Sequence, residues 1–144
     1  MSMEKELLNT FDKELLLKDL CARLPYGVKV NGVFLTYDKD KDKILYKECV
    51  KELNYSHLSR YWTLKPYLFP LSSMTDKDLI KFLQIKGMNL NSDELKTFRR
   101  GTTLIVSTLP SYSRHIDWLN KNHFDYRNLI DKNLAIDCTN LNIY

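Results

Sequence analysis

The stretch Leu24–Val30 reads LPYGVKV, and it marks the point where the periodicity of the sequence changes. Before it, apolar residues from Leu7 to Leu24 recur at helical spacing with charged residues between them, which is typical of an amphipathic helix. Pro25 restricts the residue before it and Gly27 readily adopts left-handed dihedral angles, so the helix is expected to end here. After Gly27 the apolar residues alternate with a period of two. The stretch therefore predicts a helix that leads directly into a β-strand.

Two extended segments follow. Asn31-Gly32 is a candidate tight turn within the first of them, whose alternating apolar residues are Val28, Val30, Val33, Leu35 and Tyr37. The second strand is expected at Lys43 to Val50. The run Asp38–Lys43, DKDKDK, begins like a calcium loop, but its sixth position is Lys43 instead of glycine, and its twelfth is Cys49 instead of glutamate. A solvated hairpin loop is therefore predicted between the strands.

The centre of the chain is rich in aromatic residues. Pro66 and Pro70 exclude a regular helix around them, so Tyr55 to Leu71 is predicted to be extended and partly buried. Thr75 and Asp78 have the spacing of a capping box at the start of a helix, which Gly87 is expected to end.

The C-terminal half alternates short elements. Thr102 to Leu109 is predicted to be β-rich, and a helix is expected to begin near Ser113 and to end at Asn120–Asn122. Asp125 is predicted to cap a further short helix, with Asn133 in the left-handed position after it and a final strand at Leu134 to Cys138. The pattern favours an α+β class: a single compact domain of short helices on a small, mainly antiparallel sheet, spanning residues 1–144, with residues 1–12 as a loosely attached helical extension.

The composition narrows the class of protein. A content of 44% hydrophobic residues is enough to bury a core, and a net charge of +4 is only mildly basic, which is compatible with an anionic partner. Cys21, Cys49 and Cys138 have no spacing that chelates zinc or supports redox chemistry, and Cys138 is expected to be a buried thiol. No segment is apolar over the length of a membrane span. A cytoplasmic protein without a cofactor is predicted.

Several phrases of the sequence resemble a known family. They are Lys18–Val30, Lys65–Leu68, Ser72–Thr75, Asp117–Asn120 and His123–Arg127, and they are similar to a family of small uncharacterised proteins from gut anaerobic bacteria and their phages and prophages. The resemblance implies a phage-linked setting. It implies no catalytic residue, ligand or activity.

Two His-x-Asp tripeptides suggest metal chemistry, His115-Ile116-Asp117 and His123-Phe124-Asp125. Residues two apart on a helix lie about 200° apart around its axis, so His115 and Asp117 point to different sides. Asp125 is already expected to cap a helix. Structural roles are therefore favoured for the motif, and a metal site of His115, His123 and Asp125 is kept as the alternative.

Basic residues interleaved with aromatic ones are the remaining signal. Guanidinium groups pair with phosphates and aromatic rings stack on bases, so an anionic ligand such as a nucleotide or nucleic acid is expected to contact Arg60, Tyr61, Trp62, Arg99, Arg100 and Arg127. The competing interpretation places these aromatic rings in the core.

The hypothesis that follows is a non-enzymatic binding module of phage or prophage type, which acts on a host protein or an anionic ligand and counteracts or modulates a host process. One alternative is a small metal-dependent hydrolase that uses His115 and His123 with nearby carboxylates. Another is a subunit of a virion or of its assembly. A homo-oligomer is compatible with the sequence.

Overall fold

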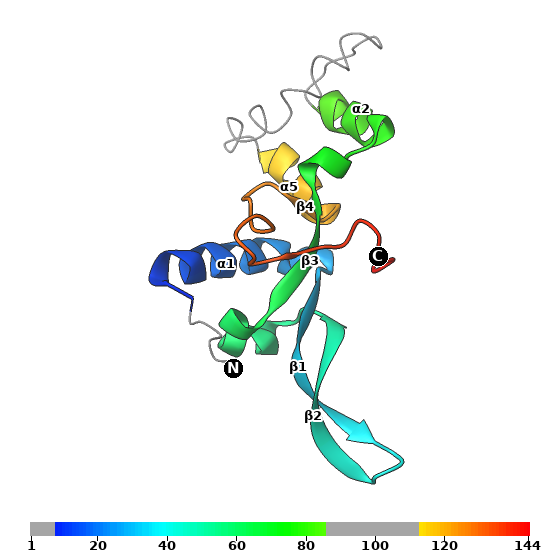
Figure 1. Ribbon diagram of the computed structural model, residues 1–144. Coiled ribbons are helices and arrows are strands. Elements are labelled where there is room, and N and C mark those ends of the chain that lie inside the picture. The colour runs from blue at the N-terminus through cyan, green and yellow to red at the C-terminus, as the bar shows by residue number, and fades with distance from the viewer. Residues whose placement is uncertain (1–7, 86–112) are drawn as a thin grey trace.

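A computed structural model describes residues 8–85 and 113–144, and shows an α+β body from which one hairpin projects (Figure 1). The helices are α1 (Thr10–Arg23), α2 (Asp76–Ile85) and α5 (Ser113–Lys121), with the 3-10 helices η1 (Leu24–Tyr26), η2 (Tyr55–Thr63) and η3 (Leu71–Ser73). The strands are β1 (Lys29–Asp38), β2 (Lys43–Glu52), β3 (Lys65–Pro70), β4 (Phe124–Asp125) and β5 (Ile136–Asp137). The α+β class with a mainly antiparallel sheet is confirmed.

Strand β3 is the centre of the sheet, whose order is β2-β1-β3-β4, with β5 also paired to β3. β1 pairs antiparallel with β2 along its whole length, but it pairs with β3 only at Val30 and Asn31. β4 and β5 are short and run parallel to β3. Beyond Asn31, β1 therefore has β2 as its only partner strand among the described residues.

The change from helix to strand lies where the sequence predicts it. The side chain of Asn9 caps α1 by accepting a hydrogen bond of 2.7 Å from the backbone N–H of Asp12. η1 continues α1 for one turn, and Gly27 ends it with a φ of 71°. β1 begins two residues later, which confirms the interpretation of the LPYG sequence.

The predicted turn at Asn31-Gly32 is wrong, because β1 runs through both residues without a break. Gly32 has another role at this position. A Cβ atom there would lie 2.6 Å from Cδ2 of Leu64 and 3.2 Å from the ring of Phe34. The glycine therefore allows the segment after η2 to pack directly on the strand.

The prediction that Tyr55 to Leu71 is extended holds for only part of the segment. Its first part forms η2, which Asn54 and His57 begin with a reciprocal capping box. Pro66 and Pro70 lie farther along, inside β3, where they break no helix. The prolines exclude a helix only where they occur, and the residues before Lys65 had no such restriction.

Local signals predict the caps and turns of the later elements, but not every element beside them. Thr75 and Asp78 form the expected capping box of α2, with two N–H to side-chain oxygen distances of 3.1 Å. Asp125 accepts three backbone hydrogen bonds as a cap would, but the residues after it form turns instead of the predicted helix. Asn133 has a φ of 58°, as expected. The predicted final strand, Leu134 to Cys138, is reduced to β5. The predictions at Gly87 and Thr102–Leu109 lie outside the described residues.

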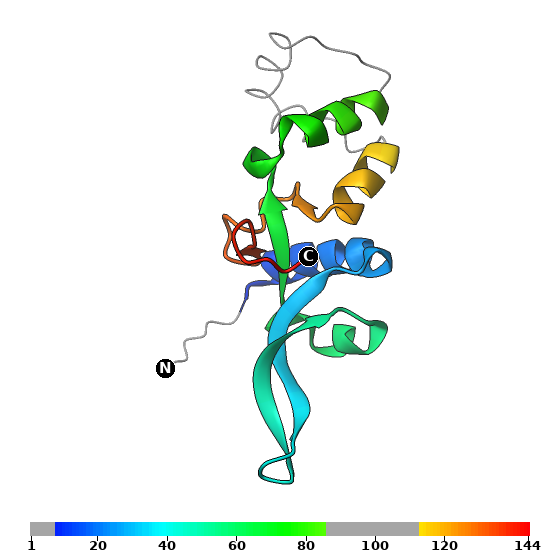
Figure 2. The same cartoon turned by 90° about the vertical axis from the view of Figure 1, so that its right-hand side faces the viewer.

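Two hydrophobic clusters support the body. The larger one joins α1, the base of the hairpin, β3 and the C-terminal turns, and includes Leu20, Val30, Leu68 and Leu129. The second lies at the other end, where Phe82 of α2 and Leu119 of α5 pack with Phe124. Figures 1 and 2 agree that α2 and α5 lie at one end of the molecule and the hairpin at the opposite end. Within the described residues, no helix is long and apolar enough to cross a membrane.

Candidate functional site

The part of β1 beyond Asn31 and its partner strand β2 form a two-stranded projection, called here the arm (Figures 1 and 2). Side chains of a strand alternate between its two faces, and opposite residues of an antiparallel pair share a face. The register pairs Leu35 with Tyr46 and Tyr37 with Ile44. One surface of the arm therefore carries six large exposed apolar side chains. We call this surface the arm face: Val33, Leu35, Tyr37, Ile44, Tyr46 and Val50.

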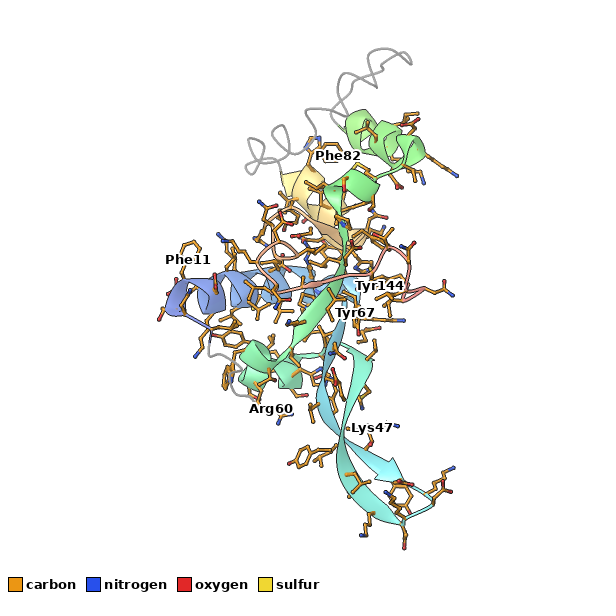
Figure 3. The ribbon with its side chains drawn as sticks, in the orientation of Figure 1. Phe11, Lys47, Arg60, Tyr67, Phe82 and Tyr144 are labelled. Atoms are coloured by element: carbon orange, nitrogen blue, oxygen red, sulfur yellow. The ribbon has the colours of Figure 1, made fainter. Side chains whose placement is uncertain are left out.

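The opposite surface of the arm is partly covered by the body. The ring of Phe34 is buried there and lies 4.9 Å, centroid to centroid, from the ring of His57 of η2. Arg60 of η2 donates a hydrogen bond of 3.2 Å to the backbone carbonyl of Val33. Figure 3 shows Arg60 beside the base of the arm and Lys47 farther along it. The body thus holds the base of the arm from one side and leaves the arm face uncovered.

Polar groups fix the ends of the arm face. At the base, the Asn31 side chain donates a 2.8 Å hydrogen bond to Glu48, the one charged residue within the face. At the tip, the Asp38 carboxylate accepts from the backbone N–H groups of Asp40 and Lys41, which closes the loop. The Tyr37 hydroxyl donates to Asp42, and this bond raises the pKa of Tyr37 above its usual value. The predicted solvated hairpin loop is confirmed.

The His-x-Asp residues do not come together. His115 is buried on α5, with its ring 5.0 Å from that of Phe82, and Asp117 is exposed on the same helix. The His123 ring stacks on Tyr144, with centroids 3.7 Å apart. Burial, reinforced by the charges of Arg23 and Lys29, lowers the pKa of His123 to about 4. Among the described residues, no three His, Cys, Asp or Glu side chains could hold a metal ion together.

Arg127, a predicted ligand contact, pairs inside the protein. Its Nη1 lies 2.8 Å from one carboxylate oxygen of Asp19, and Nε of Arg23 lies 2.8 Å from the other. Asp19 and Arg23 are completely buried, and Arg23 also donates a 2.6 Å hydrogen bond to the carbonyl of Phe124. Both guanidinium groups lie over the ring of Tyr126. We call Asp19, Arg23 and Arg127 the charged cluster; it joins α1 to the segment after α5.

The other predicted contacts are only partly brought together. Arg60, Tyr61 and Trp62 are consecutive in η2, and Tyr61 packs against the larger core cluster with its ring edge-on to Trp62. Trp62 is exposed, and Nζ of Lys13 lies 5.6 Å from its ring centroid. Arg99 and Arg100 lie outside the described residues. Of the predicted set, a small basic and aromatic surface at η2 remains.

A hollow of about 340 Å³ between β3 and α2 holds no assembled catalytic group. It is lined partly by Ser73, Thr75, Asp78 and Thr139, whose side chains all form intramolecular hydrogen bonds. Cys138 lies elsewhere, buried, and its burial beside Asp137 raises the thiol pKa to about 11, which disfavours the thiolate that a nucleophile requires.

The arm face is the feature that the sequence-based site prediction missed. The sequence predicts that its residues form strands, but Phe34 and Leu35 are both apolar, so alternation alone does not reveal which surface is exposed. The signal for the arm is the length of the hairpin. β1 and β2 have ten residues each, and the strands that follow are too short to pair with β1 along its whole length, so part of the hairpin must project.

Comparisons with known proteins add no relative. No protein family, no curated protein and no solved structure matches the chain.

Proposed function

We propose that this chain is a non-enzymatic protein-binding module and that the arm face is its contact surface. The observation that carries the proposal is the exposure of six large apolar side chains on one surface of a projecting hairpin. Ile44 and Tyr46 are exposed to 67% and 66% in the described structure. Contiguous apolar surface of this kind marks interaction sites in soluble proteins, because leaving it in water is unfavourable.

The charge of the hairpin supports a protein as partner instead of a polynucleotide. Residues 29–52 contain six lysines and five acidic residues, so the hairpin is almost neutral. Binding to a polynucleotide depends on an excess of positive charge, because phosphate contacts supply most of the affinity. Tyrosines among aliphatic residues, as on the arm face, are typical of protein interfaces.

A host-cell protein is the target that the phage-linked resemblance favours, and binding it would counteract or modulate the process in which that protein acts. An exposed hairpin suits this task because its outer surface can pack on an apolar site of the target.

Photo-crosslinking in host cells tests the proposal. Benzoylphenylalanine in place of Tyr46 should give one discrete adduct with a host protein, identified by mass spectrometry. The matched control is the same replacement at Tyr55, which is also exposed but lies on η2. Equal adducts at both positions, or none at Tyr46, would contradict the arm face as the contact surface.

A second candidate function rests on the surface at η2. Trp62 is exposed beside Lys13, and Arg60 lies two residues before it, which suits stacking on a base next to a phosphate. Titration of the tryptophan fluorescence with single-stranded DNA, RNA and cyclic nucleotides at two salt concentrations tests this branch, with Trp62→Phe reporting which tryptophan responds. A polynucleotide signal should weaken steeply with salt. No signal from any of these ligands removes the branch.

A further inference from the structure

We propose that the arm face also binds the arm face of a second copy of this chain, with the two arms antiparallel and stacked face to face. The inference rests on the proposed function, because it gives the same surface a second, competing partner. The dimer and the complex with a target would then exclude each other. Free protein would keep its apolar surface covered until a target displaces the second copy.

The shape of the arm favours a flat partner of its own kind. A two-stranded hairpin is marginally stable in water and gains stability when another layer covers its apolar surface. Two twisted ribbons can pack face to face as two sheets do in a β-sandwich. Across a two-fold axis the same residues meet on both sides, so Leu35 and Tyr46, which oppose each other in the register, lie at the centre of the contact.

The charges select the antiparallel arrangement. Glu48 is the one charged residue within the arm face, and it lies toward the base of the arm. Two parallel arms would place both Glu48 carboxylates at the same level. Antiparallel arms bring the tip of one to the base of the other, where Glu48 meets a loop that carries Lys39 and Lys41. Two of the three acidic residues of that loop, Asp38 and Asp42, already accept hydrogen bonds within the hairpin.

Stacking is favoured over edge-to-edge pairing of the arms. β2 is the outer strand of the sheet, and it carries Lys43, Lys47 and Lys51 on the surface opposite the arm face. Lysines along an edge strand are a common protection against pairing with another chain. The arm face itself has no such protection, since its single charge is bonded to Asn31.

The size of the face predicts a reversible dimer. Tyrosine buries ~150–250 Å² when it is covered, so six half-exposed apolar side chains offer on the order of 500 Å² for each arm. A standard stable interface buries about 800 Å² on each partner. We therefore expect a Kd on the order of micromolar, with the dimer present in concentrated protein and absent in dilute protein.

Sedimentation velocity over a range of concentrations measures this dimer in the purified full chain. We expect the double variant Leu35→Ser, Tyr46→Ser to raise its Kd by about 100-fold, because central apolar residues dominate an interface. The matched control is Leu141→Ser, Tyr55→Ser, which removes the same two residue types at similarly exposed positions of the body. The control should dimerise like the parent chain. Thermal unfolding confirms that both variants are folded.

A charge test addresses the arrangement. Glu48→Lys should weaken self-association, and a chain with glutamate in place of Lys39 and Lys41 should do the same. Mixing the two variants should restore a heterodimer, because the lysine introduced at position 48 then meets the acidic loop of the other variant. A mixture that stays as weakly associated as its separate components would overturn the antiparallel arrangement.

The outcomes separate this inference from the proposed function. A parent chain that stays monomeric at every accessible concentration overturns the dimer, and so does a dimer that the double variant leaves intact. Neither result affects the crosslinking at Tyr46 in host cells. If a target is found there, its addition should dissociate the dimer. A complex that contains the target and both copies of the chain would show that target binding and dimerisation do not exclude each other.

Discussion

The body buries charges, whereas the arm exposes apolar side chains. In the body, Asp19 and Arg23 are fully buried, and Arg127 completes the charged cluster. On the arm, all six large apolar residues of the arm face are more than 40% exposed. Each region thus reverses the usual preference for charges outside and apolar groups inside.

The two reversals have different consequences for the molecule. The charged cluster joins segments that are 108 residues apart, so it specifies how α1 and the C-terminal segment pack. The arm face joins nothing in the described chain. A side chain that contributes little to folding and is unfavourable in water is best explained by a partner that covers it.

Asp19→Ala should produce the largest loss of stability. It removes both ion pairs of the cluster and leaves the buried guanidinium of Arg23 without its carboxylate. Breaking a buried pair by removing one partner costs about 3–5 kcal/mol, so urea unfolding should show a loss of that size. Glu14→Ala on the exposed side of the same helix is the control and should change little. Equal stability of the two variants would mean that the cluster does not hold the body together.

Gly32→Ala should have the second largest effect, since it acts where the arm leaves the body. The added Cβ would lie 2.6 Å from Leu64 Cδ2, and one of the two must move. Overpacking of this kind costs about 1–3 kcal/mol, measurable as a lower urea midpoint. Thr36→Ala, farther along β1, is the control. A neutral Gly32→Ala would show that Leu64 does not pack tightly on the strand.

His123 should make the stability of the body depend on pH. The pKa of His123 is lowered from about 6.5 to about 4 in the folded chain, so below pH 6.5 the unfolded chain binds a proton that the folded chain does not. His123 therefore contributes stability that is present above pH 6.5 and is lost as the pH falls toward 4. His123→Phe, which keeps a ring against Tyr144, should reduce the fall in Tm between pH 7 and pH 5. An unchanged fall would assign the acid sensitivity to other groups.

Whether the sequence predicts a feature depends on how far apart along the chain the residues that determine it lie. The end of α1 at Pro25 and Gly27, the capping box of Thr75 and Asp78, and the left-handed Asn133 all depend on residues a few positions apart. These predictions are confirmed. Each of them relies on a local steric or hydrogen-bonding rule that tertiary contacts do not override.

The failed predictions concern distant partners. Asn31-Gly32 has the composition of a turn, but Leu64, which is far along the chain, explains why glycine is required there. Arg127 resembles a free cation because its partner Asp19 is far away in sequence. The arm face was not predicted because η2 decides which surface of β1 is covered, and the sequence of β1 contains no information about η2.

The smallest effect on the free energy of unfolding is expected for substitutions on the arm face. This effect tests most directly whether the arm face contributes to the fold as the body does. The variant Leu35→Ser, Tyr46→Ser removes two large apolar side chains. In the core such a change would be severely destabilising, but both side chains are already more than half exposed. Surface substitutions usually change stability by less than about 0.5 kcal/mol, so urea unfolding in dilute protein should be close to that of the parent chain. The test must be made below the dimer Kd, because self-association would add stability that depends on concentration. A loss of several kcal/mol in dilute protein would mean that these residues support the fold of the hairpin itself, and the arm face would then need no partner to explain it. Unchanged stability together with lost crosslinking in host cells would assign these side chains to binding.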